Sequence, residues 1–106
     1  MTSQLSLLYT TFPHEEEALK VTKELLERRL IACANILGPI KSLYFWEGKL
    51  EESQEVAALF KTTSDKAQEL IHVLQELHSY DTPAILEIPV GKGALPFCEW
   101  AHKEVR

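Results

Sequence analysis

The chain has 106 residues, a formal net charge of -5 and 45% apolar residues, values typical of one soluble globular domain spanning residues 1–106. Its lysines and arginines are scattered rather than gathered in a stripe, so nucleic acid is not an expected partner. No apolar stretch reaches the roughly 20 residues that span a bilayer, and the start of the chain lacks the basic and apolar regions of a signal peptide. We therefore expect a cytoplasmic protein without a membrane partner, in which Cys33 and Cys98 are buried thiols.

The first part of the chain predicts a strand followed by a helix. Residues 5–11 form a short apolar and β-branched run, which Phe12-Pro13 interrupts. Pro13 suits the first turn of a helix over residues 13–29, because its missing N–H is not needed there. The acidic triplet at residues 15–17 then lies near the positive end of the helix dipole.

Residues 30–62 predict a long β-hairpin, the largest feature of the sequence. Both arms are rich in β-branched and aromatic residues, and Glu47-Gly48 lies between them. Gly38-Pro39 interrupts the first arm and predicts a bulge or bend, because proline cannot donate to a strand ladder. Residues 56–60 are apolar on both faces, which indicates a central strand.

The last part predicts a second helix, a loop, an edge strand and a short C-terminal helix. Thr63 or Ser64 is a suitable N-cap for the second helix, whose apolar residues follow helical spacing from 67 to 77. A loop over residues 78–83 leads to a strand at 84–90, where Pro89 favours an edge position. The terminal helix, residues 95–105, is expected to turn Phe97 and Trp100 toward the core.

This order of elements is the split βαβ, or ferredoxin-like, α+β pattern βαββαβ, with a long central hairpin and a short C-terminal helix. In that fold two helices cover one face of a four-stranded sheet and leave the other face without cover. Residues 44–46 add three adjacent aromatic side chains to the hairpin. A large apolar surface in a soluble chain normally marks an interface, so self-association is expected.

Several motifs resemble the CutA family of divalent-cation tolerance proteins. They occur in the family's order across nearly the whole chain, at residues 29–36, 42–49, 61–62, 78–83 and 100. The resemblance implies a ferredoxin-like fold similar to the PII signalling proteins, a homotrimer, and a link to tolerance of copper and other divalent cations. It brings no settled enzymatic activity, and the sequence lacks a Walker loop or a GxSxG motif, so we do not expect an enzyme.

The resemblance also implies where copper would bind, and this chain departs from the family there. Some members use a cysteine of the first strand and a His-His pair, and those positions hold Tyr9, Leu77 and His78 here. A single imidazole offers too few donors for a tight copper site. We therefore expect weak binding of copper or another divalent cation, with His78 as its contact; a helix-capping histidine is the alternative.

The family's motifs further carry a polar and aromatic set that a trimer could gather in the clefts between its subunits. This set consists of Tyr44, Trp46, Glu55, Lys61, His78 and Tyr80. Packing of the interface itself is another explanation for these side chains. Two functions follow: a non-enzymatic trimer linked to metal tolerance, or a PII-like signalling trimer that binds a small effector or a partner protein.

Overall fold

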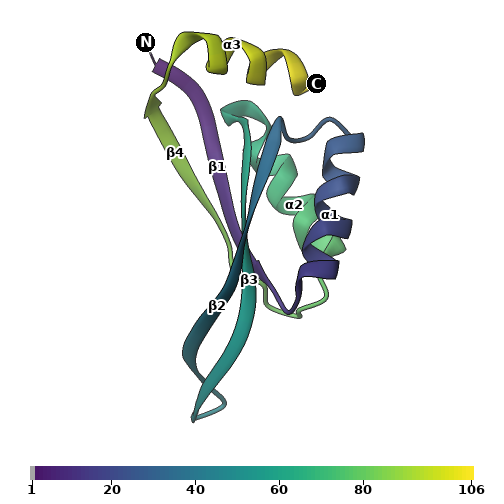
Figure 1. The fold of residues 1–106 in the computed structure, drawn as a ribbon, viewed down its shortest axis with the longest axis vertical. Helices are drawn as coiled ribbons and strands as arrows, with labels where there is room; N and C mark the ends of the chain where they lie inside the picture. The colour runs from purple at the N-terminus through teal and green to yellow at the C-terminus, as the bar shows by residue number, and fades with distance from the viewer. Residues whose placement is uncertain (1) are drawn as a thin grey trace.

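A computed structural model describes residues 2–106, with side chains from Gln4 onward, and confirms the ferredoxin-like α+β fold (Figure 1). The four strands form one antiparallel sheet in the order β2-β3-β1-β4. None of the helices in the described part of the chain could span a membrane. In chain order the elements are β1 (Thr2–Phe12), α1 (Glu15–Glu27), β2 (Cys33–Trp46), β3 (Lys49–Thr63), a 3₁₀ turn (Ser64–Lys66), α2 (Ala67–Leu77), β4 (Ile85–Lys92) and α3 (Leu95–Glu104).

The main core lies between the sheet and the two long helices. Alternate residues of β1 and β3 point to this face, and Leu8 and Phe60 pair across the two strands there. Leu25 of α1 and Leu70 of α2 pack on them and are fully buried. The period-2 pattern of the strands and the 3.6-residue pattern of the helices therefore meet in one apolar layer.

The second face of the sheet is covered at one end only. Leu5 packs there in a small cluster with Cys98 and Ala101 of α3. The expectation that Phe97 and Trp100 face the core is wrong, since they are 40% and 43% exposed. The small residues Cys98 and Ala101 form the buried face of α3, and Phe97 and Trp100 lie beside that face on the helix.

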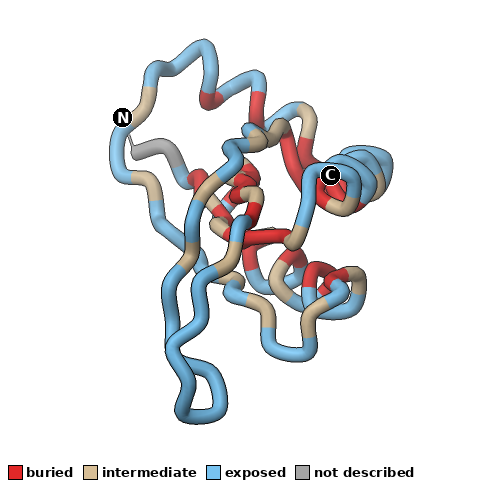
Figure 2. Tube along the Cα trace, turned by 60° about the horizontal axis from the view of Figure 1, so that its bottom comes forward, coloured by how far each residue is buried: buried red, intermediate tan, exposed pale blue. Residues whose placement is uncertain are grey.

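Beyond this core the central hairpin continues alone as a two-stranded ribbon. Pairing between β1 and β3 ends at Phe12 and Val56, whereas β2 and β3 stay paired out to Trp46 and Lys49. We call residues 40–55 the ribbon; it projects from the body of the molecule and is exposed along nearly its whole length (Figures 1 and 2). A ribbon of this kind has marginal stability in water by itself.

The predicted bend lies at the root of the ribbon, as a register shift between Leu37 and Ile40. Gly38 approaches the facing arm closely, since a Cβ there would lie 3.1 Å from Cγ2 of Val56, which would have to shift to make room. At the far end Glu47 and Gly48 both have positive φ angles, 52° and 79°. That combination is found in the tight turns that match the twist of paired strands.

Several element boundaries differ from the prediction. His14, and not Pro13, precedes α1, and its Nδ1 accepts the Glu17 N–H at 3.2 Å. Thr63 precedes the 3₁₀ turn rather than α2 and makes no side-chain capping hydrogen bond. Strand β4 extends to Lys92, which pairs with β1, so Gly91 lies within a strand that was predicted to end at residue 90.

Two threonines that face the helices give a matched stability test. Both are fully buried, but Thr62 donates to the Leu30 carbonyl at 2.7 Å, whereas the Thr10 hydroxyl has no hydrogen-bond partner among the described residues. We predict that Thr10→Val raises the free energy of unfolding by about 1 kcal/mol, because it removes an unpaired buried hydroxyl, and that Thr62→Val lowers it by about 1–2 kcal/mol. Guanidinium unfolding at one fixed protein concentration measures both, and an equal loss in the two variants would contradict the assignment.

Candidate functional site

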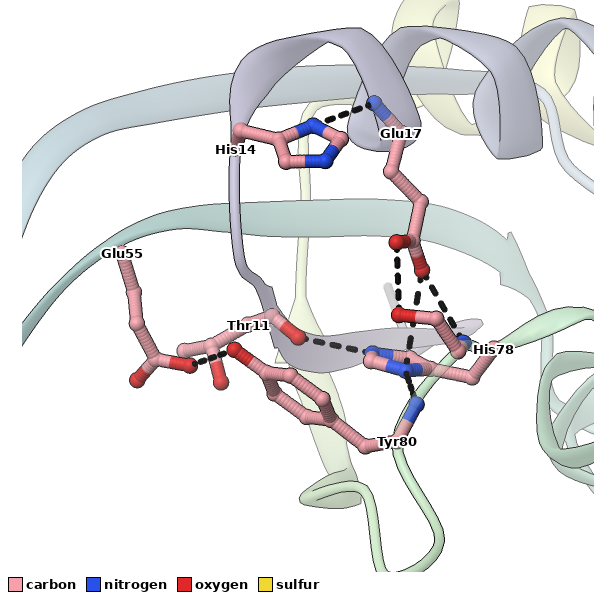
Figure 3. A network of polar contacts seen from close by, with 7 residues as sticks. Thr11, His14, Glu17, Glu55, His78 and Tyr80 are labelled. Carbon is pink, nitrogen blue, oxygen red and sulfur yellow. Dashed lines mark hydrogen bonds and ion pairs between the residues drawn. The ribbon is translucent and has the colours of Figure 1, made fainter.

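A polar network lies where β1 ends and the loop after α2 passes between α1 and the root of the ribbon (Figure 3). The loop supplies His78, Ser79 and Tyr80, which are consecutive in the sequence. These three side chains bond to three different elements of the fold: β1, α1 and β3. The site is therefore a junction, and its geometry depends on all of the surrounding elements.

His78 is the buried centre of this junction. Its ring stacks on Phe12 with centroids 4.6 Å apart and an interplanar angle of 6°. The backbone N–H of Tyr80 donates to Nδ1 at 3.1 Å, so Nε2 carries the proton and donates to the Thr11 carbonyl at 2.7 Å. Both ring nitrogens are thus occupied by bonds within the chain.

Glu17 attaches the same loop to the first turn of α1. Its carboxylate accepts the Ser79 hydroxyl at 2.6 Å and the Ser79 N–H at 3.0 Å. The carboxylate also lies 3.8 Å from Nδ1 of His78, which is too far for a hydrogen bond. The acidic triplet predicted to favour the helix dipole therefore includes one residue with a second, specific contact.

Tyr80 connects the loop to the ribbon. Its hydroxyl donates to Oε2 of Glu55 at 2.6 Å, the length of a charge-assisted hydrogen bond. Glu55 is only 8% exposed although it lies just beyond the end of β1 pairing. Burial and the bond to Glu55 raise the pKa of the Tyr80 phenol above its usual range, which keeps it protonated as the donor.

Within one chain, the structure brings together three of the six predicted cleft residues: Glu55, His78 and Tyr80 (Figure 3). Two of the other three lie elsewhere. Trp46 is near the ribbon tip, where it pairs with Lys49 and is 53% exposed. Lys61 lies at the opposite end of β3, with its Nζ 5.5 Å from the centre of the Phe97 ring.

Tyr44 lies on the ribbon, close enough to the junction to contribute to the raised pKa of the Tyr80 phenol. Its hydroxyl is 3.4 Å from the Ser53 hydroxyl, on the neighbouring arm. Its side chain is 43% exposed and forms part of the surface that the ribbon presents. Tyr44 thus lies beside the junction, and its hydroxyl contacts Ser53 on the ribbon.

The donor set of one chain does not fit a tight copper site. Tyr9 lies in the sheet between Leu59 and Leu86, and Leu77 packs against the main core and offers no donor atom. Among the described residues, no group of three His, Cys, Asp or Glu side chains converges as a metal ion would require. His78 could contact a cation only by giving up one of its two hydrogen bonds.

A shallow hollow adjoins the junction. It has a volume of about 310 Å³ and lies between the start of α1 and the bend of the ribbon, and its lining includes Glu15, Gln54 and Glu55. Carboxylate and amide oxygens on its walls favour a cationic or hydrogen-bond-donating group over an anion.

Sequence reasoning missed the contacts that assemble the junction. The Thr11 carbonyl has no side-chain signature, and the Glu17–Ser79 contact joins residues 62 positions apart. A sequence signal existed only for the loop: a histidine, a serine and a tyrosine directly after a helix, before a proline.

The fold and the uncovered sheet face define a ferredoxin-like protein with a projecting ribbon, and comparisons with known proteins identify its family. The family model "CutA1 divalent ion tolerance protein" matches residues 6–104. A divalent-cation tolerance protein CutA from Thermococcus kodakarensis is 50% identical over 94 residues, which cover 89% of each chain. The chain belongs to the CutA1 divalent ion tolerance family.

Solved structures agree with this assignment. The periplasmic divalent cation tolerance protein CutA from Archaeoglobus fulgidus is 42% identical and superposes with a TM-score of 0.92, over 96% of this chain and 99% of that one. CutA1 from Oryza sativa is 30% identical with a TM-score of 0.95, over 99% and 96% of the two chains. The ribbon and its bend thus belong to a chain path that these relatives share.

Proposed function

We propose that this protein is a non-enzymatic homotrimer of the divalent-cation tolerance family that binds copper or a related divalent cation weakly. Membership of the family supports the link to divalent cations. The observation that carries the proposal is the uncovered apolar surface of the sheet and ribbon, because it indicates that a single chain is not the working unit.

This apolar surface has two parts. On the second face of the sheet, Leu86 and Ile88 of the edge strand are 59% and 45% exposed. On the ribbon, Phe45 and Leu50 pair across the arms and are 74% and 66% exposed. Exposed apolar patches of this extent mark interaction sites, and closing a ring of identical subunits buries such a surface on every copy.

The trimer is tested by the mass of the protein in solution. We predict that light scattering gives the mass of three chains, and that this mass persists on dilution to micromolar protein because the subunit interface is apolar. A mass of one chain at micromolar concentration would contradict the proposal. Mutating Phe45→Glu places a charge on the ribbon and should lower the mass toward that of one chain.

The geometry of His78 supports weak rather than tight cation binding. A cation at Nδ1 would displace the Tyr80 N–H, and one at Nε2 would displace a buried bond to the Thr11 carbonyl. Losing such a bond costs about 1–3 kcal/mol, which subtracts from the affinity of any metal ion. Glu17 is the nearest carboxylate to the ring and is already bonded to Ser79.

Calorimetry with copper tests this assignment. We predict weak binding that His78→Ala reduces further, and that falls as the pH drops through the histidine range, since only the neutral imidazole binds a metal. His72 is a matched control, because it is exposed on α2 and lies outside the junction, so His72→Ala should leave binding unchanged. Tight binding that survives His78→Ala but is lost when Cys33 and Cys98 are blocked would contradict the choice of site.

The same copper titration distinguishes metal binding from the alternative function, a PII-like signalling trimer with an effector or partner protein in its inter-subunit clefts. The hollow beside Glu55 favours this alternative, because it exposes polar groups next to the ribbon root. In that case copper produces no His78-dependent heat.

We also propose a cytoplasmic location, although the Archaeoglobus fulgidus relative is described as periplasmic.

A further inference from the structure

We propose that Tyr80 and Glu55 form a clasp that fixes the direction in which the ribbon leaves the body of the protein. Here the clasp means the single hydrogen bond from the Tyr80 hydroxyl to the Glu55 carboxylate, 2.6 Å long. Its role in assembly rests on the proposed trimer, whereas its effect on the ribbon exists in any state of association. Tyr80 thus positions the ribbon by holding Glu55 at its root.

The ribbon needs such a support because it leaves the sheet at its weakest point. Beyond Val56, strand β3 has lost β1 as a neighbour and pairs with β2 alone. At the same level β2 carries the register shift between Leu37 and Ile40, which interrupts the ladder. Two-stranded ribbons twist and bend more readily than sheets, so backbone pairing by itself leaves the direction of this one poorly determined.

Glu55 is the first residue of β3 beyond the last β1 pair, so a bond to it acts directly at this root. Among the described residues, no lysine or arginine forms an ion pair with Glu55, although its side chain is buried. The phenol of Tyr80 is thus the donor that stabilises this carboxylate. A buried carboxylate without a donor is strongly disfavoured, so Glu55 stays against Tyr80 and the ribbon root stays with it.

Tyr80 can serve as a fixed point because its own backbone is held from two sides. Its N–H donates to Nδ1 of His78, whose ring is stacked on Phe12. The preceding residue, Ser79, is bonded twice to Glu17 of α1. The clasp therefore links the ribbon root to the body of the protein through β1 and α1, not through a loose loop (Figure 3).

The direction of the ribbon has a large effect at its tip. The seven residues of β3 from Lys49 to Glu55 span about 20 Å, so a change of about 10° at the root moves the tip by about 3–4 Å. The exposed aromatic residues Phe45 and Trp46 lie at that tip. A shift of this size is as large as one residue of a strand, enough to misplace these side chains on a neighbouring subunit.

Amide hydrogen exchange on the full-length protein tests the clasp. In Tyr80→Phe, which removes only the hydroxyl, we expect exchange of the amides of residues 40–55 to become about tenfold faster or more, while those of α1 and β1 keep their wild-type rates. Glu55→Gln is the matched variant, because its amide oxygen still accepts from Tyr80. Its exchange over residues 40–55 should stay within about threefold of wild type.

The outcomes separate the clasp from general stability and from the proposed trimer. The clasp would be overturned if amide exchange over residues 40–55 in Tyr80→Phe were as slow as in the wild type. It would also be overturned if the exchange rate rose evenly over the whole chain. If light scattering shows one chain in the wild type, the trimer is contradicted, but the exchange comparison still tests the clasp within that chain. If the wild type is trimeric, Tyr80→Phe should also dissociate at a protein concentration about tenfold higher than the wild type does, and an unchanged dissociation would overturn the role in assembly.

Discussion

The structure depends on one mismatch of length: β3 and β2 are longer than the strand that pairs with β3 on its other side. Pairing with β1 ends at Phe12 and Val56, and the hairpin goes on to Trp46 and Lys49. Up to that level the main core lies between the sheet and helices α1 and α2, and a small cluster under α3 covers one end of the other face. Everything beyond it lacks a core of its own, so the ribbon needs both an anchor at its root and a surface to cover it.

The anchor and the candidate site are the same group of residues. His78 binds the end of β1, Ser79 binds α1, and Tyr80 binds the ribbon. A cation that takes a ring nitrogen of His78 would compete with the bonds that position this loop. In the proposed function, metal binding and ribbon direction are linked, because the metal ion and the hydrogen bonds that position the loop both need the ring nitrogens of His78.

The sequence predicted the fold more completely than the site. Strand and helix patterns are local, so β3 could be assigned as a central strand from the apolar residues 56–60, and the bend from Gly38-Pro39. Phe97 and Trp100 were misplaced because a large aromatic residue is usually buried. At α3 the small residues Cys98 and Ala101 make the contact instead.

The junction could be predicted only in part, for a physical reason. Its residues come from segments far apart in the sequence, and two of its acceptors are a backbone carbonyl and a glutamate in a row of three. His78, Tyr80 and Glu55 were named through the resemblance to a family. Tyr44, named with them, lies on the ribbon beside the junction. Lys61 and Trp46 lie apart from it in one chain, Lys61 near the far end of β3 and Trp46 near the ribbon tip.

We infer that, of the two parts of the apolar surface, the ribbon is the one on which assembly of the proposed trimer depends. The most direct test removes it: residues 42–53 are replaced by Asn-Gly, a pair suited to the tight turn that would then join Lys41 to Gln54, which are register partners. Glu55 and the whole two-layer core are retained. We expect a variant that still unfolds cooperatively but has the mass of one chain by light scattering. A shortened protein that keeps the mass of three chains would contradict it.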